Sequence, residues 1–302
     1  MPISSRPSPG RHRIAATLRW WMCVLTTALA ATPAMAGDLP EPGRQMVRFE
    51  APAPLITPAE MQHRLGGRPP AGFEEIDLAA ERFHILMPRV ETTEQRTPKA
   101  WGLFVFIHPG GDGRPHRPWL DVLARHRLIW VGPDAAGNDR DPWSRVRLAL
   151  QAAHSMCERY PDIDRRRVYV AGVSGGGRIA SITAMLWPDV FHGGVYMVGS
   201  NYFRNIRSPA RPDAHYRATF PRPRGKAFEL TRERSRHVLL TGEQDGNRGQ
   251  TLGNYRFGYQ RDGFRHVTYL QVPGMGHTPP PAAWLEKAIE ALDAPIMSEE
   301  DA

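Results

Sequence analysis

Short apolar runs alternate with longer amphipathic stretches along most of the 302-residue chain. Continuous runs of aliphatic, β-branched or aromatic residues between turn-forming residues are typical of strands that are buried on both faces of a parallel sheet. Such runs lie at 103–107, 128–131, 168–171, 194–198, 237–240 and 266–270. An alternating run at 81–87 predicts one further strand near the start of the domain.

The segments between these runs carry apolar residues at helical spacing, which predicts helices at 146–160, 179–186, 255–261 and 282–292. Strands that alternate with helices favour one α/β domain with a mainly parallel central sheet and helices on both faces. Two stretches fall outside this rhythm. Residues 37–75 are rich in Pro and weakly patterned, so we expect an irregular lead. Residues 201–236 are too long for an ordinary connection, which predicts a lid-like insertion or an excursion without regular structure.

Residues 1–36 have the layout of a secretory signal peptide. They contain four arginines and no acidic residue, then an apolar stretch at 20–31, then Ala34-Met35-Ala36. We expect cleavage after Ala36, a secreted or periplasmic location, and a single domain at 37–302 with no stable membrane insertion. The alternative is an uncleaved anchor, which the short apolar stretch disfavours because about 20 residues are needed to span a bilayer.

Charge and cysteine content narrow the function. Without residues 1–36 the formal charge falls from +8 to +4, and Cys157 alone remains, so an internal disulfide is excluded. The segment 201–236 holds ten basic residues and three acidic ones. Such a segment can attract polyanions or acidic substrates, but no nucleic-acid recognition motif accompanies it. We therefore expect no nucleic-acid partner, and the absence of C-x-x-C and H-E-x-x-H motifs predicts no metal.

Gly172-Val173-Ser174-Gly175-Gly176 follows one predicted strand and precedes a predicted helix. In that context the pattern G-x-S-x-G forms a nucleophile elbow, a sharp turn that holds the serine hydroxyl at the tip of the sheet. Glycine leaves room for the turn and adopts its unusual dihedral angles. The pattern is short enough to occur by chance. It indicates a catalytic serine only if a base, an acid and an oxyanion loop follow the ends of other predicted strands. Ser174 is the candidate nucleophile.

A serine hydroxyl is a poor nucleophile at neutral pH and needs a neighbouring base. His277 is the best candidate, because it follows the predicted strand at 266–270 and precedes the last helix. A loop in that position lies at the carboxyl edge of a parallel sheet, where the elbow also emerges. The alternative interpretation is an ordinary histidine in a surface loop.

The imidazole of such a base must be held in one tautomer, which requires a carboxylate. Asp245 is the preferred acid, because it comes just after the predicted strand at 237–240. Glu243 is a rival, and Asp262 is a weaker one. The resulting order Ser174, Asp245, His277 is the order expected for α/β-hydrolases.

The oxyanion of a tetrahedral intermediate needs backbone N–H donors. One predicted donor is Gly175, next to the nucleophile. The other should come from the loop His108-Pro109-Gly110-Gly111, which follows the strand at 103–107 and is similar to the H-G-G-G loop of lipases and esterases. Proline has no N–H, so either Gly110 or Gly111 must serve, and the sequence leaves that choice open.

Together these residues resemble the α/β-hydrolase superfamily over nearly all of 37–302. Asp162-Ile163-Asp164-Arg165, leading through 168–171 into the elbow, looks like the corresponding segment of polyhydroxybutyrate-depolymerase-type and feruloyl-esterase-type carboxylesterases. The resemblance implies an α/β-hydrolase fold and an exported Ser-His-Asp ester hydrolase without a cofactor.

The resemblance does not fix the substrate. We expect a small-molecule ester or an acyl group on a polysaccharide, because the chain leaves no room for the separate adsorption domain that often accompanies hydrolysis of solid polyester. Two other functions stay open. One is a serine peptidase of the prolyl-oligopeptidase clan, and the other is a non-catalytic binding protein on a hydrolase scaffold.

Overall fold

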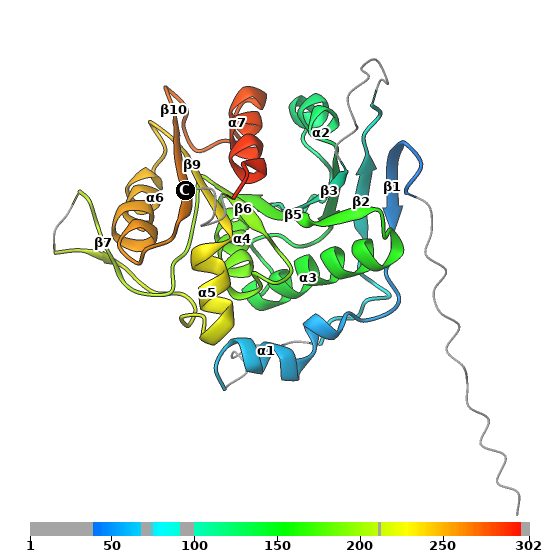
Figure 1. Ribbon diagram of the computed structural model, residues 1–302, viewed down its shortest axis with the longest axis horizontal. Helices are drawn as coiled ribbons and strands as arrows, with labels where there is room; N and C mark the ends of the chain where they lie inside the picture. The colour runs from blue at the N-terminus through cyan, green and yellow to red at the C-terminus, as the bar shows by residue number, and fades with distance from the viewer. Residues whose placement is uncertain (1–38, 68–72, 74, 91–99, 211–212, 297–302) are drawn as a thin grey trace, which may run out of the picture. The chain divides into compact units, whose positions relative to one another are not determined.

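The central sheet contains eight strands in the order β1-β2-β4-β3-β5-β6-β9-β10 (Figure 1). The strands are β1 (Gly43–Val47), β2 (Phe83–Met87), β3 (Trp101–Ile107), β4 (Leu128–Pro133), β5 (Ile163–Val173), β6 (Gly193–Met197), β9 (Arg236–Gly242) and β10 (His266–Val272). Strand β2 runs antiparallel to β1 and β4, and the other neighbouring strands run parallel. In this register Leu103 lies opposite Val168, and Val170 lies opposite Gly194.

This computed structural model describes residues 39–67, 73, 75–90, 100–210 and 213–296, all within one compact unit. The predicted signal peptide lies outside the described residues. Within those ranges, no helix combines the length and apolar character required for crossing a membrane.

Helices cover both faces of the sheet (Figure 1). On one face α3 (Pro142–Arg159) and α4 (Gly175–Leu186) pack together, and α5 (Gly225–Glu233) packs against α4. On the other face lie α2 (Leu120–Arg125) and α7 (Ala282–Asp293). Helix α6 (Arg248–Gly253) continues into the π-helix η3 (Asn254–Gln260) beside β10. The predicted α/β architecture is confirmed.

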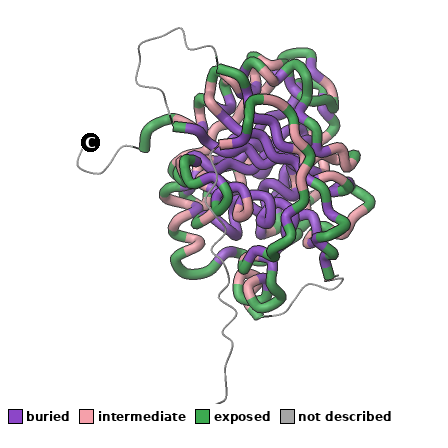
Figure 2. Tube along the Cα trace, turned by 90° about the vertical axis from the view of Figure 1, so that its right-hand side faces the viewer, coloured by how far each residue is buried: buried purple, intermediate pink, exposed green. Residues whose placement is uncertain are grey.

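The inner strands form the centre of the hydrophobic core, and Figure 2 shows buried chain in the middle of the molecule. Successive side chains of a strand point to opposite faces. In β3, Leu103, Val105 and Ile107 join the cluster beneath α3 and α4, whereas Phe104 and Phe106 join the cluster beneath α2 and α7. Both sets are buried, which explains why β3 is a continuous apolar run and lacks polar alternation.

The prediction of an irregular lead at 37–75 is wrong for much of its described part. It contains β1, the 3-10 helix η1 (Pro54–Ile56) and α1 (Pro58–Arg64). Strand β1 is an edge strand whose residues are all at least partly exposed, so it lacks a clear apolar pattern. Helix α1 is only seven residues long, and its start is set by Thr57, whose Oγ1 accepts a hydrogen bond from the Glu60 N–H at 3.3 Å.

The insertion, residues 201–236, contains regular structure. It includes the antiparallel pair β7 (Ile206–Arg207) and β8 (His215–Tyr216), then α5. Tyr202, Phe203 and Phe220 are buried and join the main core, with the first two rings stacked 4.3 Å apart. Aromatic side chains therefore anchor the insertion, and the alternative of an excursion without regular structure is wrong for its described residues.

Candidate active site

Ser174 occupies the sharp turn between β5 and α4, with φ 54° and ψ −118°. Positive φ is strained for a residue other than glycine and is characteristic of functional turns. The neighbouring glycines are required by close approach of other chain segments. A Cβ on Gly176 would lie 1.8 Å from the carbonyl oxygen of Ile107, and a Cβ on Gly175 would lie 1.9 Å from the Asn138 Oδ1. The turn therefore has the geometry of a nucleophile elbow.

The structure brings the three predicted triad residues together at the carboxyl ends of β5, β9 and β10. The His277 Nε2 lies 2.8 Å from the Ser174 Oγ, and the His277 Nδ1 lies 2.7 Å from the Asp245 Oδ1. The Asp245 carboxylate is buried and also accepts hydrogen bonds from the Thr241 hydroxyl at 2.7 Å and the Asn247 N–H at 3.0 Å. With Nδ1 protonated toward Asp245, Nε2 is the imidazole atom that can accept a proton from the Ser174 hydroxyl.

The two rival carboxylates are engaged elsewhere. The Glu243 Oε2 accepts a hydrogen bond from the Gly274 N–H at 2.9 Å. The Asp262 carboxylate accepts from the Tyr202 hydroxyl at 2.8 Å and pairs with the Arg204 guanidinium at 2.9 Å. Of the three acids weighed from the sequence, only Asp245 has a described contact with His277.

The loop after β3 lies beside the elbow. The backbone N–H groups of its two candidate oxyanion donors, Gly110 and Gly111, differ in whether they already have a hydrogen-bond acceptor. The Gly110 N–H donates to the His108 Nδ1 at 3.0 Å. Burial lowers the pKa of His108, which keeps that imidazole neutral and able to accept. Gly111 has φ +78°, and its N–H has no acceptor among the described residues. Gly175 begins α4, where backbone N–H groups lack helical partners. The N–H groups of Gly111 and Gly175 therefore have no acceptor among the described residues, whereas that of Gly110 has one.

A cavity of about 530 Å³ contains Ser174 and Gly175 in its wall. Trp143, Ile179 and Ile182 contribute apolar surface, and Thr219 of the insertion also lines it. A second cavity of about 380 Å³ is lined by Val173 and Pro279, which are near Ser174 and His277 in the sequence, and by Trp119 and His116. Of these two cavities, only the first includes Ser174 in its lining.

Sequence reasoning missed two arginines in the wall of the first cavity, Arg145 and Arg178. Arg178 had a recognisable sequence signal, because it follows Ser174 by four residues and thus lies one helical turn along α4. Arg145 had none, since its position in α3 depends on how that helix packs against the sheet.

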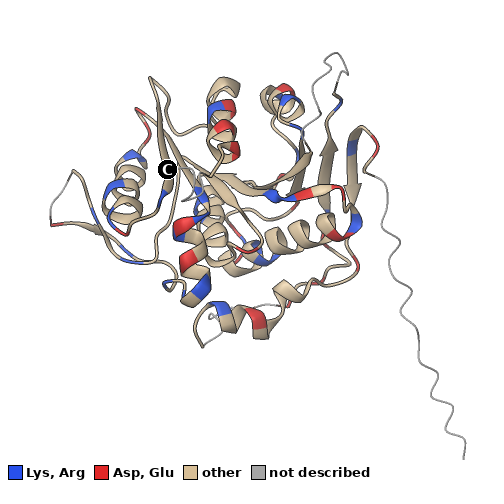
Figure 3. Cartoon of the chain, in the orientation of Figure 1, with Lys and Arg blue, Asp and Glu red and all other residues tan. Residues whose placement is uncertain are grey.

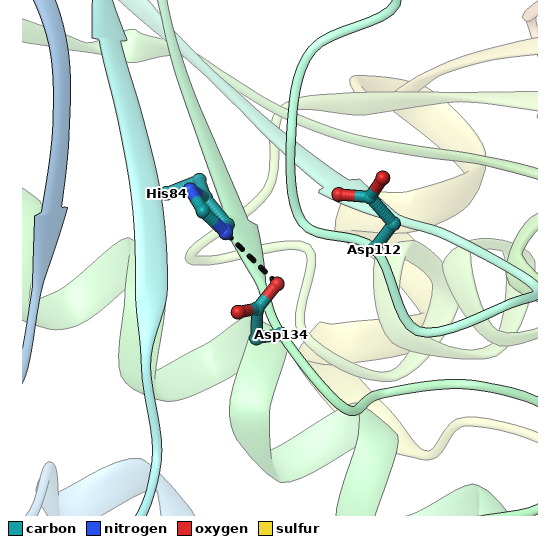
Figure 4. Close-up of side chains that lie close together, drawn as sticks. All are labelled: His84, Asp112 and Asp134. Carbon is teal, nitrogen blue, oxygen red and sulfur yellow. Dashed lines mark ion pairs between the residues drawn. The ribbon is translucent and has the colours of Figure 1, made fainter.

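His84, Asp112 and Asp134 form a cluster in which one ligand atom of each lies within 4.8 Å of the others (Figure 4). These groups already have protein partners. The His84 Nε2 lies 2.9 Å from the Asp134 Oδ1, and the Arg114 guanidinium lies 2.8 Å from the Asp112 Oδ2. That guanidinium lowers the pKa of Asp112 to about 2. The cluster is explained as an ion-pair network beside Gly111, and we assign it no metal.

No protein-family model matches the chain, and no curated protein matches it in sequence. Solved structures nevertheless share its fold. An arylesterase is 14% identical with a TM-score of 0.52, and the match covers 86% of this chain and 87% of the arylesterase. An esterase from Pyrobaculum calidifontis is 15% identical with a TM-score of 0.50, covering 70% and 80% respectively.

An acylaminoacyl peptidase in complex with Z-Gly-Gly-Phe-chloromethyl ketone is 17% identical with a TM-score of 0.50. That match covers 74% of this chain and 40% of the peptidase, so the chain spans less than half of that protein's length. At such identities the similarity shows the fold alone. With the strand order and the elbow, it confirms the predicted α/β-hydrolase fold.

Proposed function

We propose that the chain is a serine hydrolase that cleaves carboxylic esters. The observation that carries the proposal is the continuous hydrogen-bonded series from the Ser174 Oγ through the His277 imidazole to the buried Asp245 carboxylate. Each distance lies in the range that proton transfer and tautomer control require. The strained turn at Ser174 further supports a catalytic role.

In the proposed reaction, the Ser174 Oγ attacks the acyl carbon while the His277 Nε2 takes the hydroxyl proton. The N–H groups of Gly175 and Gly111 donate to the oxyanion of the tetrahedral intermediate. When that intermediate collapses, the C–O bond to the alcohol breaks and His277 passes its proton to the leaving oxygen. Water activated by His277 then hydrolyses the acyl-enzyme and restores Ser174. Asp245 holds the imidazole in orientation throughout.

An ester is favoured over a peptide by the resemblance of the segment 162–176 to exported carboxylesterases. A serine peptidase is the second candidate, because the same three residues can cleave amides and the fold is shared with an acylaminoacyl peptidase.

We also propose export with removal of residues 1–36. Amino-terminal sequencing of the exported protein tests this proposal, which requires Gly37 as the first residue.

The proposed activity is tested by assaying 4-nitrophenyl acetate and butyrate beside an aminoacyl 4-nitroanilide, with Ser174→Ala as the control. We expect ester turnover that disappears in the variant, and fluorophosphonate labelling at Ser174 detected by mass spectrometry. Turnover of the anilide alone would identify a peptidase. Failure of the wild type both to hydrolyse any of these substrates and to take the label would support a non-catalytic protein.

A further inference from the structure

The cavity that contains Ser174 has a positively charged wall and no acidic lining residue. Arg178 and Arg145 both line it, together with the neutral amides of Asn138, Asn201 and Asn247. Arg178 lies in the first turn of α4, just after Ser174, and both residues line this one cavity. Any group that occupies this cavity while its ester bond reaches Ser174 lies close to a guanidinium.

The Arg178 guanidinium has only neutral partners. It donates to the Asn201 Oδ1 at 3.2 Å and to the Asn247 Oδ1 at 3.3 Å. These two bonds use two of its five N–H groups, and no carboxylate in the described parts of the chain lies within 4.0 Å of it. Burial lowers the pKa of Arg178, and the charge of Asp245 only partly opposes that effect. A partly buried cation without a paired anion is costly to maintain, and a bound anion would offset that cost.

Arg145 adds a second positive charge but is held in place by the protein. Its Nε donates to the carbonyl of Ala136 at 2.7 Å, and its Nη1 donates to the Asn138 Oδ1 at 3.2 Å. Burial lowers the pKa of Arg145 to about 10. These bonds hold the loop that carries Asn138 over Gly175. Arg145 therefore adds positive electrostatic potential to the cavity and fixes the position of this loop. Arg178, in contrast, retains N–H groups that can donate to a ligand.

We infer that this cavity selects esters that carry a carboxylate, and that the Arg178 guanidinium binds that carboxylate. The inference rests on the proposed function and adds the chemical class of the substrate. The planar guanidinium can donate two parallel N–H bonds to a carboxylate, a geometry that a lysine ammonium cannot reproduce. The apolar surface of Trp143, Ile179 and Ile182 would contact the carbon chain between the ester and the anion.

Two matched pairs of substrates test the inference. For the acyl side, 4-nitrophenyl hydrogen glutarate is compared with 4-nitrophenyl pentanoate, which has the same chain length and no charge. For the alcohol side, 4-acetoxybenzoate is compared with 4-acetoxybenzamide. We expect the wild type to prefer the anionic member of one pair by at least about tenfold in kcat/KM, and the pair identifies the side. Equal rates within both pairs would overturn the inference.

Variants of Arg178 test the residue itself. Arg178→Gln should reduce the anionic-to-neutral ratio of kcat/KM by roughly 10- to 100-fold, mainly through a higher KM for the anionic ester. Arg178→Lys should give an intermediate ratio. The control is Arg261→Gln, which removes one exposed positive charge that does not line the cavity and should leave the ratio unchanged. If Arg178→Gln slows both esters equally, its role is to position the Asn247 loop and the inference is wrong.

Calorimetry separates this inference from the proposed function. The probes are the amide analogues N-(4-nitrophenyl)glutaramate and 4-acetamidobenzoate, titrated into Ser174→Ala and into the Ser174→Ala, Arg178→Gln double variant. Binding of one probe that weakens at least about tenfold in the double variant supports the inference, even if no ester is hydrolysed. Hydrolysis of esters without charge preference, with equal binding to both variants, would overturn the inference and leave the proposed function intact.

Discussion

His237 provides a quantitative test of how this protein responds to pH. The residue lies in β9 and is completely buried against the rings of Tyr259 and Phe264. Its Nδ1 lies 2.7 Å from the Tyr196 hydroxyl, and its Nε2 lies 3.0 Å from the carbonyl of Thr231. The neutral imidazole satisfies both contacts by accepting at Nδ1 and donating at Nε2. Burial lowers the pKa of His237 to about 4.

The sign of the effect follows from proton binding. An unfolded histidine has a pKa of about 6.5, so between pH 6.5 and 4 the unfolded chain binds a proton that the folded chain does not. The contribution of His237 to the free energy of unfolding is therefore complete above pH 6.5 and is lost as the pH falls. With pKa values of about 6.5 and about 4, the loss is about 2 kcal/mol at pH 5 and about 3 kcal/mol at pH 4.

The assay is urea unfolding of the wild type and His237→Gln at pH 7.5, 6 and 5. The glutamine amide can still donate toward Thr231, and a lower stability at pH 7.5 is expected because the aromatic contacts change. Between pH 7.5 and 5 the variant should lose about 2 kcal/mol less than the wild type. Parallel pH dependences of wild type and His237→Gln would refute the reasoning.

Three further predictions concern the candidate active site. Ser174→Ala should leave the melting temperature nearly unchanged and reduce kcat below about a thousandth of wild type, and a higher residual rate would contradict the nucleophile. Asp245→Asn should reduce kcat by a factor on the order of 10⁴, and Glu243→Gln should reduce it little. The reverse result would identify Glu243 as the acid that orients His277. Gly176→Ala should lower both activity and melting temperature, because its Cβ would lie 1.8 Å from a backbone carbonyl oxygen of β3. Gly246→Ala, with open space around its Cβ, is the matched control for stability, and equal melting temperatures of the two variants would argue against the close packing.

The sequence predicted best those features that a single segment determines. Strands such as β3 and β5 are buried on both faces, so their apolar runs were unambiguous. Ser174 directly follows β5, and Asp245 and His277 lie in the loops just after β9 and β10; parallel strands bring their carboxyl ends to one edge. The exposed edge strand β1 was missed because it is not buried on either side.

Features that depend on the folded conformation of a loop, or on packing between distant segments, could not be predicted. The choice between Gly110 and Gly111 depends on a hydrogen bond to the His108 Nδ1, which requires the folded loop. The role of Arg145 depends on the loop that contains Ala136 and Asn138, because only the folded chain brings that loop to the guanidinium. Periodicity carries no information on such contacts.

Several basic residues of the insertion have a structural explanation that does not involve a substrate. From its ten basic residues, of which Figure 3 shows those in the described part of the chain in blue, one expects steering of anionic substrates. In the structure, however, the Arg204 guanidinium pairs with Asp262 at 2.9 Å, that of Arg232 pairs with Glu233 at 2.8 Å, and that of Arg222 lies 4.0 Å from the centre of the Phe228 ring. These side chains fasten the insertion to itself and to the segment after η3.

The two explanations of anion preference make opposite predictions for Arg204. If the insertion steers substrates by charge, Arg204→Gln should raise KM for the anionic ester, and added salt should remove the difference. If Arg204 is mainly a packing residue, the variant should lower the melting temperature slightly, because a partly exposed ion pair contributes about 1 kcal/mol or less. We expect the second result, with the anionic-to-neutral ratio unchanged. A raised KM restricted to the anionic ester would place the recognition of charge in the insertion and not in α4.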